Sequence, residues 1–228
     1  MISISIFGTQ VKAKKIILLI IVAAVWASVT LVQFHWHPER GFWQGLLIGL
    51  VTTLFLLIVE FGHDLAHIVS ARYAGAPMDE ILISADMPRT LYSNNAVSPN
   101  VHRMRALGGP IFNIMGLLLS LAIYRAASSA SITKELAGWW AFGHGLQLMM
   151  SLLPLPPVDG GTILKWTLVA RGKTESEADK VVDRVDWILG SIVILAGIGL
   201  IFVQKWTMGL ILLGVGGIVF GVAAGKIR

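Results

Sequence analysis

Long uncharged apolar runs are the feature that most constrains the fold of this chain. Residues 16–34 form a run of 19 residues without a charge. That length is close to the ~20 residues that a helix needs to cross a bilayer. Only 14% of all residues are charged, whereas about a quarter are charged in a typical soluble domain. The sequence therefore predicts an integral membrane protein.

We expect an all-α membrane protein, one domain over residues 1–228, with about six transmembrane helices. The first span is 16–34, a core of three spans lies within 41–169, and two C-terminal spans lie within 187–224. A cleaved signal peptide is the alternative for the first run, but that run continues apolar past Ala27 to Phe34. Residues 78–105 are too polar to span and predict a small membrane-associated β-hairpin or re-entrant region, whereas 171–186 predicts a charged loop with a short amphipathic helix.

The distribution of basic residues predicts the orientation. Six spans place both termini on one side, and 14 of the 18 Lys and Arg residues then lie on that side. Because Lys and Arg are enriched in cytoplasmic loops, both termini are expected in the cytoplasm. This asymmetry accounts for the net charge of +5 without a nucleic-acid partner. The lipid bilayer is the partner that the composition itself requires.

Two histidines and two carboxylates follow the apolar residues 45–59, at Glu60, His63, Asp64 and His67. Ionisable groups inside a membrane are costly and mark functional sites. On a helix, His63 and His67 lie one turn apart on one face, a spacing that suits one zinc ion. A single membrane histidine is more often a hydrogen-bond partner between helices than a metal ligand, whereas this pair with its adjacent acid fits either role equally well. Glu60 remains open as a partner of a ligand, a spare base or a buried structural acid.

Two other elements are expected at the same membrane depth as the histidines. Asp159 follows Pro154, Pro156 and Pro157, which cannot continue a regular helix. Irregular backbone inside a membrane survives only when it is buried in protein or lines a wet cavity. Asn113 begins the third span on the same, cytoplasmic side. The chain has no cysteine, so a metal here must use histidine or carboxylate ligands.

His63, His67 and Asp159 would form a three-ligand zinc site with one open position, the pattern of catalytic zinc. Asp64 would take a proton from the attacking water and pass it to the leaving amine. Asn113 would donate a hydrogen bond to the oxyanion or hold the substrate backbone, or else only join two helices. His144 lies fifteen residues before Asp159, ~22 Å along a straight helix, so we do not expect it to be a ligand. The pair His35 and His37 fits an interfacial turn better than a metal site, and His102 has no predicted role.

Three motifs together resemble the site-2 protease family of intramembrane zinc metalloproteases. They are residues 63–67 (HDLAH), 108–113 (GGPIFN) and 152–161 (LLPLPPVDGG). The resemblance implies that His63, His67 and Asp159 bind Zn²⁺, that Asp64 is the general base, and that Asn113 handles substrate. It also implies single-span membrane protein substrates, with residues 81–84 in a region that pairs with an unwound substrate strand. Two positions depart from the family, because Asp64 replaces its glutamate and Ser151 replaces its usual asparagine.

The sequence therefore predicts an intramembrane zinc metalloendopeptidase that cleaves in or near transmembrane segments, with its site toward the cytoplasm. The alternative is a weak or inactive pseudoprotease that binds membrane helices as a regulator or chaperone, because Asp64 is one methylene shorter than glutamate. A metal transporter is disfavoured, because the ionisable groups cluster in one membrane half rather than in both.

Overall fold

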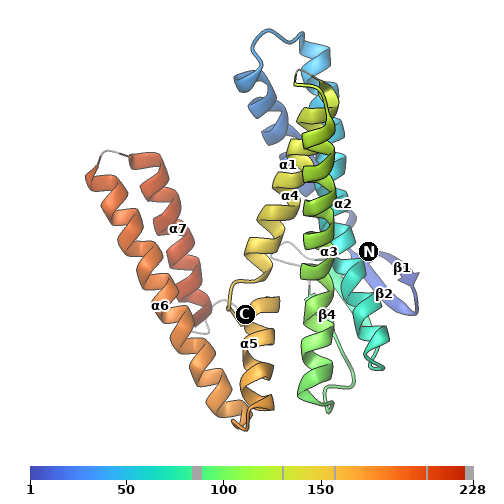
Figure 1. The fold of residues 1–228 in the computed structure, drawn as a ribbon, viewed down its shortest axis with the longest axis vertical. Coiled ribbons are helices and arrows are strands. Elements are labelled where there is room, and N and C mark those ends of the chain that lie inside the picture. Colours follow the sequence, from blue (N-terminus) through green and yellow to red (C-terminus); the bar gives the residue numbers. More distant parts are fainter. Residues whose placement is uncertain (84–88, 130, 157, 204, 224–228) are drawn as a thin grey trace. The chain divides into compact units, whose positions relative to one another are not determined.

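The computed structural model describes residues 1–83, 89–129, 131–156, 158–203 and 205–223 (Figure 1). Three residues of the sequence predictions, Ser84, Pro157 and Ala224, lie outside these ranges. The chain divides into two compact units, each described by itself below. The first comprises Met1–Val97 and Gly108–Leu148, and the second comprises Ser98–Leu107 and Met149–Arg228.

Four long helices account for most of the first unit. They are α1 (Lys15–Trp36), α2 (Phe42–Tyr73), α3 (Pro99–Ala126), whose residues up to Leu107 belong to the second unit, and α4 (Ile132–Ser151), whose last residues also do. α1 contains the predicted span 16–34, and α2, α3 and α4 correspond to the three spans predicted within 41–169. α2 ends at Tyr73, after which Gly75 has a φ of 72° and the amide of Ala76 bonds to the carbonyl of Ala71.

Four helices among the described residues are long and apolar enough to cross a membrane: α1, α2, α3 and α6 (Glu175–Phe202). They support the prediction of an integral membrane protein. The other two predicted spans correspond to α4 and α7 (Trp206–Ala223), which are not among those four. A total of six spans therefore stays a prediction.

A four-stranded sheet packs at the end of α2. Its strands are β1 (Ile2–Ile6), β2 (Thr9–Ala13), β3 (Glu80–Ile83) and β4 (Arg89–Leu91), in the order β1-β2-β3-β4. The predicted hairpin is present as the antiparallel pair β3–β4, and β2 adds to β3 in parallel. Buried residues of the strands and of α2 form one apolar core, which includes Ile81, Ile83, Ile68 and Ala71.

The hairpin β1–β2 was missed by the sequence analysis, which assigned no structure to the first residues. Its turn is made by Phe7 and Gly8, both with positive φ (47° and 81°), which matches the right-handed twist of a tight hairpin. The alternation Ile2-Ser3-Ile4-Ser5-Ile6 is the two-residue period of a strand. The signal was therefore present in the sequence.

The second unit contains α5 (Asp159–Ala170), α6 and α7. The sequence predicts a charged loop with a short amphipathic helix at 171–186. A helix is present, but the loop is wrong, because α6 begins at Glu175 and runs unbroken through Asp186 into the next predicted span. A capping box starts it, in which Thr174 accepts from the amide of Glu177 and the Glu177 side chain accepts from the amide of Thr174. Helices α6 and α7 pack closely (Figure 1), because a Cβ on Gly197 would lie 2.9 Å from the carbonyl oxygen of Gly209.

Candidate metal centre

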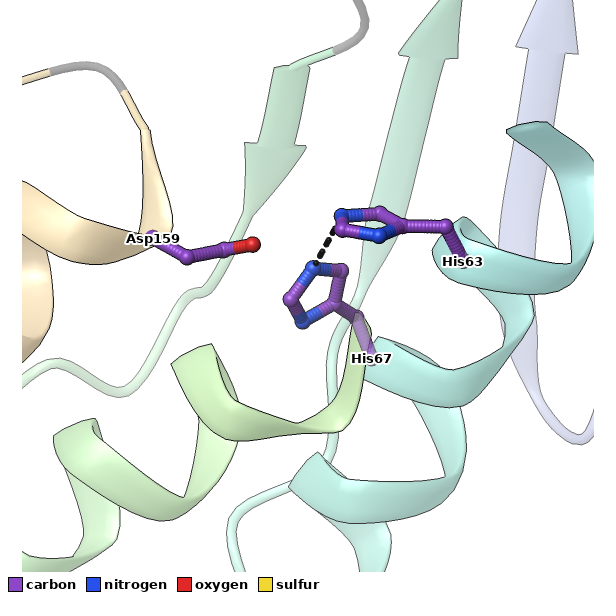
Figure 2. Close-up of side chains that lie close together, drawn as sticks. All are labelled: His63, His67 and Asp159. Atoms are coloured by element: carbon purple, nitrogen blue, oxygen red, sulfur yellow. Dashed lines mark hydrogen bonds between the residues drawn. The ribbon is translucent and has the colours of Figure 1, made fainter. Parts of the chain in front are cut away.

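The two motif histidines face each other on α2. Both His63 and His67 are 6% exposed, and their Nε2 atoms lie 3.1 Å apart (Figure 2). Their ring planes are inclined by 78° with centroids 4.7 Å apart. The spacing of one helical turn thus brings two imidazole nitrogens close enough to bind one metal ion, as predicted.

This pair fits a tetrahedral zinc ion. Zinc binds histidine nitrogen at about 2.0–2.1 Å, so two of its tetrahedral ligands lie about 3.3 Å apart. The 3.1 Å between the Nε2 atoms is close to that separation. Neutral imidazole is also a preferred zinc ligand. The donor set of α2 therefore suits the metal that the sequence predicts.

Asn113 of α3 contacts the ring of His63. Its amide group is 2.8 Å from Nδ1 of His63, the ring nitrogen that faces away from His67. The other end of the amide is 3.0 Å from Nδ1 of His144, on α4. Both Asn113 and His144 have 0% exposure. The structure thus brings His63, His67 and Asn113 together, while the substrate-binding role of Asn113 stays a prediction.

Glycines allow α3 to approach α2 at the level of the histidines. A Cβ on Gly109 would lie 2.3 Å from Cε1 of His63, and one on Gly108 would lie 2.4 Å from the carbonyl oxygen of Ala66. On α2, a Cβ on Gly62 would meet the ring of Phe112 at 2.2 Å. The Gly108-Gly109 sequence is therefore required by packing against the candidate ligand His63.

Asp159 is the first residue of α5, in the second unit. The preceding residues, among them Pro154 and Pro156, are not helical, as the prolines predict. Gly160 and Gly161 let this segment fold over the start of α5, because a Cβ on them would lie 2.2 Å from the carbonyl oxygen of Leu152 and 2.0 Å from that of Leu155. The Asp-Gly-Gly sequence is thus explained locally, and ligation by Asp159 stays a prediction.

The carboxylates of α2 flank the histidine pair along the helix. Asp64 and Glu60 are both half-buried. Since Asp64 directly follows His63, it lies within the same helical turn as both histidines. Neither its role as general base nor a role for Glu60 is decided by this placement.

His37 and His102 contact groups outside the candidate site. His37 Nδ1 is 3.3 Å from Glu39 and its Nε2 is 3.9 Å from Glu135. His102 stacks on Trp166, with ring centroids 3.7 Å apart and planes inclined by 3°. The contact of His144 with Asn113 was not predicted from the sequence. The available signal was a histidine, an ionisable residue, inside an otherwise apolar helix.

Comparisons with known proteins point to one fold. No family model matches the sequence. The chain is 26% identical over 168 residues to a Mycobacterium tuberculosis protein named "Putative zinc metalloprotease Rip3", with the same figures in two strains. A solved structure, the site-2 protease from Methanocaldococcus jannaschii, matches with a TM-score of 0.57 and 16% identity, covering 100% of this chain and 95% of that one.

The chain has the site-2 protease fold. The resemblance inferred from the three motifs is thereby confirmed. The alignment with the mycobacterial relative covers 70% of this chain but 41% of that protein, so the chain spans less than half of the curated relative it matches. The fold and the relative's name do not establish the activity or the substrates of this chain, which are proposed below.

Proposed function

We propose that this chain is an intramembrane zinc metalloendopeptidase. The observation that carries the proposal is the buried pair His63 and His67, whose Nε2 atoms converge on α2. The site-2 protease fold and the metalloprotease relative support the same reaction. Its substrates are single-span membrane proteins, cut in or near their transmembrane segments.

Three side chains would hold the zinc ion: His63, His67 and Asp159. Each offers one ligand atom, an imidazole nitrogen or a carboxylate oxygen. Three protein ligands leave one position open, as in catalytic zinc sites. When bound, zinc supplies a water of lowered pKa and polarises the scissile carbonyl. The distribution of the basic residues supports a site on the cytoplasmic side.

The protein's own groups carry the remaining steps. The carboxylate of Asp64 accepts a proton from the attacking water and delivers it to the nitrogen of the leaving amine. The apolar surroundings of α2 exclude bulk water, which strengthens each electrostatic interaction in the site. Asn113 steadies the site or the substrate through its amide.

A substrate must unwind before cleavage, because a helix hides its amide bonds in its own hydrogen bonds. Strand addition to a sheet edge would hold an unwound segment. β3 is paired on both sides, by β2 and β4, so the edge next to it is β4 (Arg89–Leu91). We place substrate pairing at β4 rather than at residues 81–84 themselves.

The first experiment tests the metal. Purified protein should contain about one zinc per chain, and both His67→Ala and Asp159→Ala should lose it, as measured by elemental analysis. His35→Ala, which removes an exposed histidine from the end of α1, should keep the zinc. Wild-type protein purified without chelators but lacking metal would overturn the ligand assignment.

The second experiment separates the protease from the pseudoprotease. A panel of single-span substrates is incubated with wild-type protein, Asp64→Glu and Asp64→Asn at equal zinc content. Wild type should cleave at least one substrate, and Asp64→Asn should cleave none. A misplacement of ~1 Å at a catalytic group costs on the order of 100-fold in rate, so Asp64→Glu should be faster. Cleavage by Asp64→Glu alone would instead favour the pseudoprotease.

A further inference from the structure

His63 is one end of a hydrogen-bonded chain that crosses three helices. It runs from His63 on α2 through the amide of Asn113 on α3 to His144 on α4, with distances of 2.8 and 3.0 Å. The three residues are 6%, 0% and 0% exposed, so water does not compete for these bonds. Partners of this kind orient metal-ligating histidines.

The ring of His144 is held in place by packing. A Cβ on Gly116 would lie 2.2 Å from it. The rings of Phe112 and Trp140 have centroids 5.4 and 5.6 Å from that of His144. Within the described residues, Nε2 of His144 has no hydrogen-bond partner. The interaction with Asn113 is therefore the polar contact that this buried imidazole makes.

Two proton arrangements satisfy the chain. In the first, Nδ2 of Asn113 donates to Nδ1 of His63, whose single proton then lies on Nε2 and is donated to His67. In the second, the amide is turned over, so that Nδ1–H of His63 donates to Oδ1 and Nδ2 donates to Nδ1 of His144. A neutral imidazole carries one N–H, and the two ends of an amide are assigned from such networks.

Only the second arrangement leaves a lone pair on Nε2 of His63 for a metal. It requires a group on the far side of Asn113 that accepts a hydrogen bond. His144 meets that requirement when its own proton lies on Nε2. A donor at this position would favour the first arrangement and block the ligand nitrogen with a proton.

We infer that His144 is a positioning residue for the zinc site. By accepting from Nδ2 of Asn113, it turns Oδ1 toward His63 and thereby fixes the ring and tautomer that bind the metal. The inference rests on the proposed function only in that His63 binds zinc. It assigns no contact between His144 and the metal or the substrate.

Zinc affinity in competition with a chelator tests this role without reference to cleavage. Loss of an outer partner typically weakens metal binding 10–100-fold. We expect His144→Leu to raise the zinc Kd by about 10-fold or more. His144→Asn, whose Oδ1 can accept where Nδ1 did, should restore a Kd within about threefold of wild type. Thr52→Val, which alters a fully buried polar residue on α2 outside this hydrogen-bonded chain, should leave the Kd unchanged.

Two further measurements complete the test. If His144 acts only through Asn113, the double variant Asn113→Leu/His144→Leu should bind zinc no more weakly than Asn113→Leu alone. Nitrogen-15 NMR of zinc-loaded wild type should show His144 with its proton on Nε2, a readout that does not depend on how a variant folds. Unchanged affinity in His144→Leu, or a proton on Nδ1 of His144, would overturn this inference alone. Absence of zinc from wild type would overturn the metal site as well.

Discussion

Gly109 lies against the ring of His63, where only a residue without a side chain fits. A Cβ there would lie 2.3 Å from Cε1 of His63, and a real Cβ cannot remain at that distance. We expect Gly109→Ala to displace the His63 ring and to weaken zinc binding by an order of magnitude or more. Zinc content after dialysis against a chelator measures this. A variant that keeps wild-type affinity would show that the ring has room to move.

Gly145→Ala is the matched control for this change. It adds the same methyl group to α4, where the nearest atom, of Leu117, would be at an ordinary 3.9 Å. Alanine also favours a helix over glycine by about 1 kcal/mol. Zinc binding and thermal stability should therefore be unchanged or slightly improved.

Single-residue roles were predictable from the sequence where they depend on local spacing. His63 and His67 meet because one helical turn separates them, and the helix is broken before Asp159 because Pro154 and Pro156 cannot continue it. His144 was not predictable in the same way, because its contact with Asn113 joins residues 31 apart in sequence. Such a contact depends on how α3 and α4 pack, which spacing along one helix does not determine.

At the scale of elements, an ion pair ties the α1–α2 loop to the start of α4. Two nitrogens of Arg40 bind the two carboxylate oxygens of Glu135, one of them at 2.9 Å. The side chains are 12% and 17% exposed. Hydrogen bonds to charged groups contribute about 1.5–3 kcal/mol. We expect Glu135→Gln to lower the apparent Tm in detergent by about 5 °C.

The same ion pair gives a dependence on pH. Partial burial alone would raise the pKa of Glu135, but the hydrogen bond and charge of Arg40, with smaller effects of His37 and Gln33, leave that pKa below its ordinary value of 4.5. A lowered pKa means that the stabilisation is present above about pH 4.5 and is lost as pH falls through the folded-state pKa. The Tm difference between wild type and Glu135→Gln should therefore shrink below pH 4.5. Glu39→Gln, a control whose side chain is 70% exposed, should show little change at any pH.

Elements with strong periodic signals were predicted more accurately than those that depend on pairing. α1, which contains a long apolar run, begins and ends within two residues of the predicted span 16–34. The parallel contact of β2 with β3 joins segments about 70 residues apart, and no local pattern determines such a pairing. The start of α6 at Glu175 was different, since Thr174 and Glu177 have the spacing of a capping box. The capping box indicates a helix start in the sequence, but the many charged residues of this segment favoured a loop in the prediction.

At the scale of the whole molecule, apolar runs predict where helices form better than they predict which helices cross the membrane. α4 begins with a charged first turn and α7 is short, so helix length and composition alone leave their crossing undecided. The asymmetry of the basic residues does not depend on helix length, because it compares the Lys and Arg residues on the two sides of the membrane. It supports six spans, whereas four crossings by α1, α2, α3 and α6 would place the loop after α5 outside.

Single cysteines decide between these two topologies, since the natural chain has none. Lys173, before α6, and Lys205, between α6 and α7, are both exposed. With six spans, Lys205→Cys should react with a membrane-impermeant maleimide in intact cells, and Lys173→Cys should react only after permeabilisation. Ser129→Cys, between α3 and α4, and Ser5→Cys, on β1, serve as the outside and inside references. Labelling of Lys173→Cys in intact cells would exclude six spans, because the loop between α5 and α6 would then face outward.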